Sequence, residues 1–276
     1  MSASADDASE IEGYQEPPER PEPPRVRNRT EIKPLPADAD FERLIHDTSP
    51  EILIAVATDA RLTEDLALAL LNRHDLPREA LETLNKNGQV AKQRKVRMAL
   101  IMHPQTPRHV SIPVIRHIHT FELMQVALLP AVPPDVKRAA EEVLIGKLGS
   151  ITSGERLALA KQSSGRVAAA LLTDKEERIM LAALSNPRMT EMYIVRALKT
   201  EIGTERLAPA VSRHEKWSFR NDVKAALLGN KHTPPARVIQ LAGELPVRLI
   251  RDVLRNGRLS PQAKNSLMAV LEKRTP

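Results

Sequence analysis

A twelve-residue stretch occurs twice in this sequence, and its recurrence points to a repeated architecture. Val96–Pro107 reads Val-Arg-Met-Ala-Leu-Ile-Met-His-Pro-Gln-Thr-Pro, and Val223–Pro234 reads Val-Lys-Ala-Ala-Leu-Leu-Gly-Asn-Lys-His-Thr-Pro. Each stretch combines the end of a buried helix, a short turn and a Thr-Pro helix start. The 127-residue offset, from Val96 to Val223, holds without a gap on both sides of the motif. We therefore expect an internal duplication of helix–turn–helix units.

From Asp38 onward the apolar residues recur with helical periodicity, and capping signals divide this region into short helices. The expected helix starts of the first half are Ser49-Pro50, Thr63, a start near Pro77, Thr106-Pro107 and Pro133-Pro134. The last of these opens an apolar stripe made of Val136, Ala139, Ala140, Val143 and Leu144. The starts at Thr190, Thr233 and Ser260 repeat this order at the same offset. We expect Thr106 and Thr233 to be N-caps, with Pro107 and Pro234 in the first turn.

These elements are similar to those of a known class of repeat proteins. Short helix pairs, an Ala-Leu-rich second helix, an Asn-Pro or His-Pro turn and a Thr-Pro start resemble the HEAT-like α-solenoids of bacteria, especially the leucine-rich repeat variant subgroup. The resemblance covers about residues 40–274. It implies a curved superhelical stack and, usually, a scaffold or binding role. Some members of the subgroup carry an iron–sulfur module, but this chain has no cysteine to hold one.

The expected fold is therefore an all-α solenoid of about 15 to 17 short helices. It comprises two homologous halves, residues 38–148 and 149–276, in one continuous solenoid. Residues 1–37 carry seven prolines, eight acids and five bases without an apolar period. We expect them to form a disordered acidic tail, because they cannot bury enough apolar surface to offset the ordering entropy.

Composition excludes several classes of protein. The lack of cysteine removes disulfides, thiolate metal sites and a Cys nucleophile. The N-terminus shows no signal peptide, and no run of 18 apolar residues could span a membrane. We expect a cytoplasmic protein with no membrane contact.

Candidate catalytic and metal-binding residues are all explained by packing or solvation. His103, His109, His117 and His119 lie close in sequence, but His117 and His119 would point about 200° apart on a helix and could not chelate one ion. His103 occupies a turn position held by Asp59, Asn186 and Asn230 in other repeats. The single pair His214-Glu215 cannot build a di-iron site, and nucleotide-binding and nucleophile motifs are missing. We expect no catalysis, no cofactor and no metal.

One segment has a biased charge. Thr83–Phe121 contains no acid, whereas its duplicate Ala210–Arg248 contains three. Residues 38–276 carry 36 bases and 27 acids, which suggests an acidic partner. The expected anion-binding face consists of Lys92, Arg94, Lys95, Arg97, Arg108 and Arg116. A merely solvated surface explains these residues equally well.

Trp217 and Phe219 are the remaining candidates, just before an expected helix at Arg220–Leu228. They would be a binding hot spot if exposed. Packing that fixes the entry of the helix is the favoured interpretation.

The favoured function is a non-catalytic scaffold or adaptor that presents a curved helical surface to an acidic protein segment. A HEAT-like nucleic-acid-binding protein, related to base excision, is the first alternative, and a HEAT-like lyase or hydroxylase is the second. The oligomeric state stays open.

Overall fold

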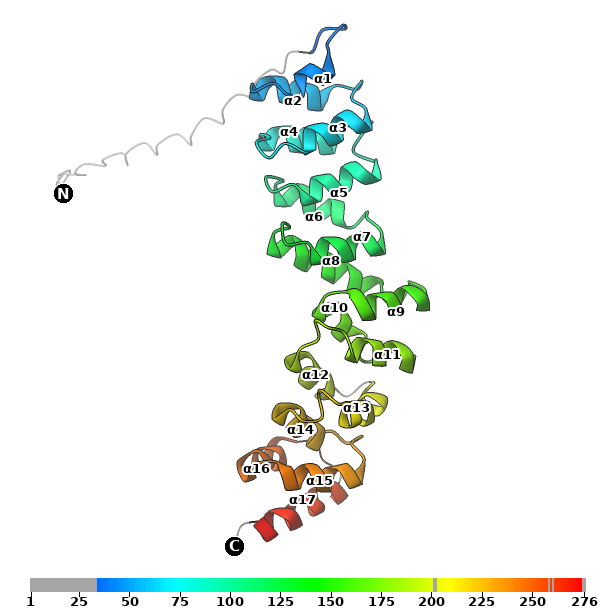
Figure 1. The fold of residues 1–276 in the computed structure, drawn as a ribbon, viewed down its shortest axis with the longest axis vertical. Helices are drawn as coiled ribbons and strands as arrows, with labels where there is room; N and C mark the ends of the chain where they lie inside the picture. The colour runs from blue at the N-terminus through cyan, green and yellow to red at the C-terminus, as the bar shows by residue number, and fades with distance from the viewer. Residues whose placement is uncertain (1–33, 201–202, 258, 260, 275–276) are drawn as a thin grey trace, which may run out of the picture. The chain divides into compact units, whose positions relative to one another are not determined.

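The computed structural model describes residues 34–200, 203–257, 259 and 261–274, which fold into short helices stacked in chain order (Figure 1). Within these residues there are seventeen α-helices and no strand. The first eight are α1 (Phe41–Leu44), α2 (Pro50–Thr58), α3 (Glu64–Leu71), α4 (Arg78–Lys86), α5 (Arg94–Met102), α6 (Arg108–Ile115), α7 (Thr120–Leu128) and α8 (Pro134–Lys147). The others are α9 (Ser153–Gln162), α10 (Gly165–Ala170), α11 (Glu177–Leu184), α12 (Glu191–Leu198), α13 (Thr204–Arg213), α14 (Asn221–Leu228), α15 (Pro235–Glu244), α16 (Val247–Asn256) and α17 (Pro261–Arg274).

The helices pack in pairs, and from α2 onward each also contacts a helix two places before or after it in the chain. One series of contacts joins α6, α8, α10, α12, α14 and α16, and α2 packs on α4 in the same alternating way. A second series joins α3 to α5 and α7, α9 to α11 and α13, and α15 to α17. Alternate helices therefore form two layers. Sequential contacts of this kind are characteristic of a solenoid.

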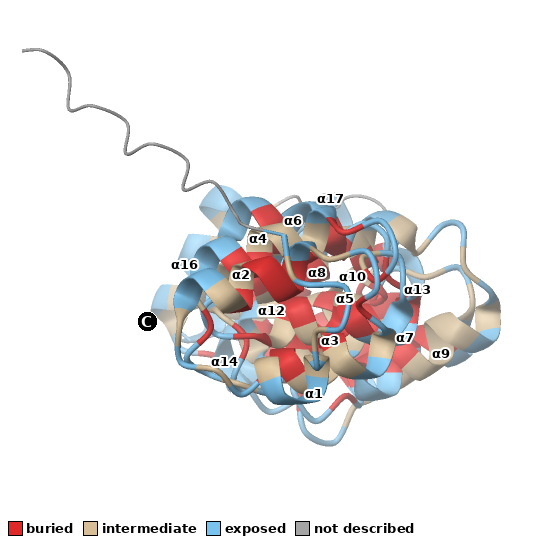
Figure 2. Cartoon of the chain, turned by 90° about the horizontal axis from the view of Figure 1, so that it is seen from above, coloured by how far each residue is buried: buried red, intermediate tan, exposed pale blue. Residues whose placement is uncertain are grey.

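Buried residues, most of them apolar, lie between the helices, whereas exposed residues lie on the outside (Figure 2). One core cluster runs from Ile45 to Leu100, and a larger one runs from Met98 to Leu267. The two clusters meet in α5, which contributes to both. The core does not divide at Leu148, because Leu144 and Leu159 belong to the same cluster.

Side chains also connect successive units by capping helix ends. The amide of Asn87, after α4, donates to the carbonyl oxygens of Ala57 and Asp59 at the end of α2. Asn186, after α11, donates to the Ala160 carbonyl of α9 at 2.8 Å. Asn230, after α14, donates to the Leu198 carbonyl of α12 at 2.7 Å.

These caps satisfy carbonyls that the preceding helices leave without an intrahelical partner. The asparagines are buried, so each cap replaces water that cannot reach the helix end. Each side-chain oxygen also accepts the main-chain N–H two residues later, which fixes the turn: Gln89, Arg188 and His232 supply these N–H groups. The same side chain thus shapes its own turn and anchors the unit to its predecessor.

The expected caps at Thr106 and Thr233 were wrong. The helices begin one residue later than expected, with Pro107 and Pro234 at the N-cap positions. Both threonine hydroxyls instead donate backwards, at 2.6 Å, to Leu100 and Leu227 in the preceding helices. A threonine hydroxyl can satisfy a C-terminal carbonyl as readily as an N-terminal N–H, and here proline holds the start of the next helix.

Other expected helix starts are confirmed. Thr63 caps α3 by accepting the N–H of Leu66, and Ser49 precedes α2 with Pro50 in its first turn. The expected stripe of α8 faces the core, where Val136, Ala140 and Leu144 are buried. Ser260 lies outside the described residues.

Most of the expected tail, residues 1–33, also lies outside the described residues. Its last four residues belong to the helical unit that runs from Pro34. The Arg61 guanidinium donates to the carbonyls of Pro36 and Ala37, and Leu35 packs against the first core cluster. These contacts join residues 34–37 to the helical body.

Candidate functional site

A groove of about 810 Å³ crosses one layer of the second half of the chain. Three consecutive helices of that layer, α12, α14 and α16, form it. Each contributes residues at helical spacing, such as Met192, Val195 and Leu198 from α12. The volume lies in the range of about 300–1,000 Å³ that is typical of ligand sites.

The groove exists because small residues line its floor. Ala225, Ala226 and Gly229 come from α14, and Gly257 follows α16. At Gly257 an added Cβ would lie 2.4 Å from the Val253 carbonyl oxygen, so no larger residue fits there without a shift. That Cβ would also lie 3.4 Å from the Cα of Gly229, so the ends of α14 and α16 approach closely at these two glycines.

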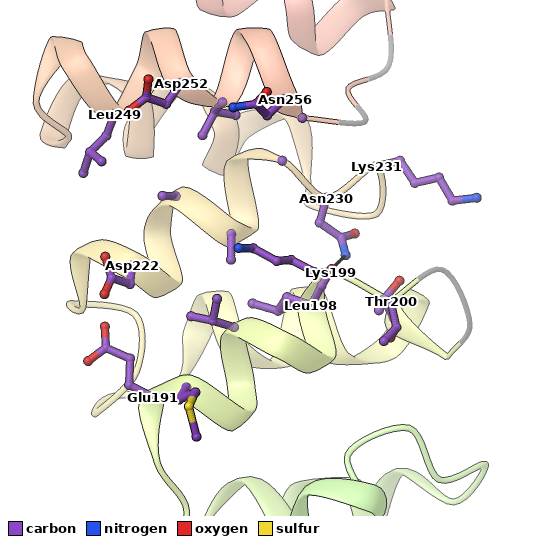
Figure 3. A pocket seen from close by; sticks show the side chains of 18 residues that line it. Glu191, Leu198, Lys199, Thr200, Asp222, Asn230, Lys231, Leu249, Asp252 and Asn256 are labelled. Atoms are coloured by element: carbon purple, nitrogen blue, oxygen red, sulfur yellow. Dashed lines mark hydrogen bonds between the residues drawn. The ribbon is translucent and has the colours of Figure 1, made fainter. Parts of the chain in front are cut away.

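Both acidic and basic side chains line the groove (Figure 3). The carboxylates of Glu191, Asp222 and Asp252 line the groove, one from each helix: Glu191 and Asp222 lie near each other, and Asp252 lies on the α16 wall. We name these three residues the acidic rim. Lys199, at the end of α12, and Lys231, after α14, lie at the opposite helix ends. None of these five side chains forms a salt bridge within the described part of the chain.

A second hollow of about 680 Å³ lies beside α12 in the same layer, against α10. Tyr193 and Arg196 line it, and Thr200 lines both hollows. Arg166 also lines it, but its guanidinium is held by Glu141 and Glu142 of α8. The hollow is largely apolar because α10 supplies Ala169 and Ala170.

The six basic residues singled out in the sequence do not form one cluster. Arg108 starts α6, where it pairs with Asp135 at the start of α8 at 2.7 Å. Arg116 follows the other end of α6, about 12 Å away along an eight-residue helix. The other four lie in or just before α5, near the α6–α7 turn, where the Arg97 guanidinium donates to the His117 carbonyl at 3.5 Å.

Two of the four side chains near α5 are committed to structure. The Arg94 guanidinium pairs with the carboxylate of Glu122, whose side chain is only 8% exposed. Burial raises the pKa of Glu122, but the hydrogen bonds from Arg94 and the His119 N–H outweigh it and hold the pKa below its usual value. Arg97 also donates to the Ala91 carbonyl.

Three of the six cations remain available. Lys92, Lys95 and Arg116 are exposed, and no ion pair or hydrogen bond involves their side chains within the described residues. We call these three residues the basic edge. Glu122 and Asp135, two acids outside the acid-free stretch, neutralise Arg94 and Arg108, which the linear sequence does not show.

The two aromatic candidates have different environments. Trp217 is 3% exposed, and its indole N–H donates to the Leu184 carbonyl at the end of α11, at 3.0 Å. It is therefore a core residue that caps a helix end, and it offers no surface to a partner. Phe219 is 74% exposed and precedes α14 at the end that carries Asp222.

His103 shapes a turn, and His109 lies beside an acid. His103 ends α5, accepts the Gln105 N–H on Nδ1 and contacts the Arg73 carbonyl through Nε2 at 2.7 Å. Burial lowers the pKa of His103 from its ordinary value. This is the turn role expected from the sequence. His109 contacts Glu82, and among the described residues no group of three His, Asp or Glu side chains is placed to hold a metal ion.

The groove was not anticipated, although the sequence carries a signal for it. At the 127-residue offset, Ala225 and Gly229 take the places of Met98 and Met102. Replacing two long side chains by small ones on one helix face marks a hollow once the packing is known. The sequence alone did not show which face of the helix lies outward.

Within the described residues, no helix is long and apolar enough to cross a membrane. Comparison of the chain with protein-family models, with curated proteins and with solved structures found no match. The function therefore has to follow from the geometry of these surfaces.

Proposed function

We propose that this protein is a non-catalytic helical-repeat scaffold that binds a segment of a partner protein in the groove across α12, α14 and α16. The observation that carries the proposal is the groove itself, about 810 Å³ and open along three consecutive helices. Apolar side chains of Met192, Val195 and Leu249 are only partly covered there. A methionine that is 68% exposed, as Met192 is, adapts to different partner side chains.

We also propose that the solenoid arose by duplication of one half. HEAT-like and leucine-rich repeat variant proteins are likewise built from repeated units. The helix starts support the duplication. Arg94, Arg108 and Pro134 begin α5, α6 and α8, and Asn221, Pro235 and Pro261 begin α14, α15 and α17, each at the 127-residue offset. The pairings also correspond, since α3 packs on α5 and α12 on α14.

The duplication has a geometric consequence. Corresponding helices are nine places apart, as α5 and α14 are, and nine is odd. Because helices alternate between two layers, each helix of the first half corresponds to one in the opposite layer of the second. The groove layer α12–α14–α16 thus corresponds to α3–α5–α7.

A second binding surface is proposed at the basic edge. Lys92, Lys95 and Arg116 are exposed and unpaired among the described residues, and the body carries an excess of bases. An acidic protein segment would bind there by charge, and a nucleic-acid backbone is the alternative partner. Three cations support only weak, salt-sensitive binding.

The groove proposal is tested by filling the groove. The double variant Ala225→Met, Gly229→Met restores the methionines of the corresponding first-half helix. At Gly229 an added Cβ would meet its nearest atoms at 3.7 Å, and the backbone is helical, so the variant should fold. We expect it to lose a protein that the wild type retains from native lysate at both low and high salt.

Two further arms distinguish the alternatives. Nuclease treatment removes the retained material if nucleic acid is the partner, and Lys92→Glu with Lys95→Glu abolishes it if the basic edge is the binding surface. Equal retention by the wild type and the groove-filling variant would contradict the groove proposal. A lyase or hydroxylase would instead convert a small molecule and bind no protein segment.

A further inference from the structure

We propose that the groove takes an extended peptide of about six residues in which Lys or Arg occupies alternate positions and apolar residues lie between them. This inference rests on the proposed function and specifies its partner. It follows from the charge of the acidic rim, the length of the groove and the apolar groups on its walls.

The charge of the acidic rim opposes that of the molecule. Residues 38–276 carry nine more bases than acids, yet Glu191, Asp222 and Asp252 line the groove without a described salt bridge. Three carboxylates that line one groove attract a cationic side chain. They also repel phosphate, so a nucleic-acid backbone is disfavoured in this groove.

The fold does not require all of these carboxylates. Glu191 and Asp222 lie in the first turns of α12 and α14, where acids favour the helix dipole. Asp252 lies in the middle of α16, where the dipole gives no such benefit. At the 127-residue offset, Lys95 and Gln125 stand in place of Asp222 and Asp252. The corresponding helices, α5 and α7, therefore form with a lysine or a glutamine at these positions.

The dimensions of the groove favour an extended segment. Packed helices lie about 8–10 Å apart, so three of them span about 16–20 Å between axes. An extended chain rises about 3.3 Å per residue, and five or six residues cover this span. Side chains of such a chain alternate in direction, so every second residue faces the acidic rim.

The lysines on the opposite side of the groove limit the positions that the basic residues of the peptide can take. Lys199 and Lys231 lie at the other helix ends, and Lys199 extends toward the centre of the groove (Figure 3). Basic residues are therefore accommodated on one side of the peptide only. The remaining residues meet Met192, Val195 and Leu249, which suit aliphatic side chains.

Selection from a random heptapeptide library displayed on phage tests the inference, with the full chain immobilised. We expect enrichment of peptides with Lys or Arg at alternate positions and aliphatic residues between them. The affinity of the selected peptides, made with a fluorescent label, is then measured by anisotropy. Each carboxylate should contribute about two- to fivefold, so Glu191→Gln, Asp222→Asn, Asp252→Asn together should weaken binding about 10- to 100-fold.

The matched control is Glu177→Gln with Glu205→Gln. These exposed acids lie in the first turns of α11 and α13, so they share the helix-dipole position but do not line the groove. The control should bind within about twofold of the wild type. Met192→Arg adds a cation to the exposed wall without disturbing the core, and it should weaken binding even if the groove-filling variant folds poorly.

The outcomes separate the two proposals. If the selected peptides lose binding to the groove-filling variant, the groove is the binding site. If those peptides also show no enrichment of Lys or Arg, or bind the triple variant as well as the wild type, the proposed peptide chemistry is wrong but the groove proposal stands. Peptides that bind the wild type, the groove-filling variant and Met192→Arg alike would overturn both proposals. Failure to enrich any peptide would also count against both.

Discussion

Removing the cap that Asn186 provides should weaken the packing between α9 and α11. Its side chain is 2% exposed, and its amide donates to the Ala160 and Ser163 carbonyls at 2.8 and 3.3 Å. Its oxygen accepts the Arg188 N–H at 2.7 Å. Asn186→Ala removes the hydrogen-bond partner of the Ala160 and Ser163 carbonyls and of the Arg188 N–H. Each orphaned group costs about 1–3 kcal/mol, so the variant should lose about 3 kcal/mol of unfolding free energy.

The loss should be local, because each unit of a helical stack contacts only its neighbours. Urea unfolding followed by circular dichroism gives the free energy, and hydrogen exchange locates the change. We expect faster exchange in α9 and α11 than in α15 and α17.

The control is Asn72→Ala, at the exposed end of α3, whose side chain makes no hydrogen bond to any residue that the structure describes. It should change the unfolding free energy by less than about 0.5 kcal/mol. A cost below about 1 kcal/mol at Asn186, or equal costs at the two sites, would refute the view that these caps join successive units.

Three further predictions concern stability. Burial lowers the pKa of His103, so the unfolded chain binds a proton at this residue more readily than the folded chain does. The stability that neutral His103 contributes is therefore complete above the unfolded pKa of about 6.5, and it declines as pH falls below that value. The urea midpoint should therefore depend less on pH in His103→Asn, which copies Asn230, and an unchanged pH dependence would contradict this. Thr233→Ala should cost about 1 kcal/mol in urea unfolding because the hydroxyl donates to the Leu227 carbonyl, whereas Thr233→Ser should be nearly neutral; equal costs would remove the assigned bond. A chain that starts at Asp38 should melt about 2–4 °C below one that starts at Pro34, since it loses the packing of Leu35 and the acceptors of Arg61; equal melting temperatures would show that these contacts contribute nothing.

The sequence determined the helical class and the order of its elements. Period and cap signals act within a few residues, so the start at Thr63 and the buried stripe of Val136, Ala140 and Leu144 could be predicted from local rules. The recurrence of the Val96–Pro107 motif at Val223 predicted where later helices begin. The turn role of His103 followed from the Asp and Asn residues at equivalent positions.

The tertiary structure decided what those local rules leave open. Thr106 has a hydroxyl that can cap the helix before it or after it, and only the position of the Leu100 carbonyl settles the direction. Arg94 is neutralised by Glu122, which is 28 residues away in sequence and adjacent only after α5 and α7 pack. Trp217 became a core residue for the same reason.

The groove depends most strongly on tertiary structure. Ala225 and Gly229 mark a small-residue face, but a helix with small residues can either pack closely against a neighbour or leave a hollow. Which outcome results depends on the alternation of layers, because that alternation turns α14 toward α12 and α16. Local sequence patterns set the faces of each helix, and packing between distant residues decides which face remains open to a partner.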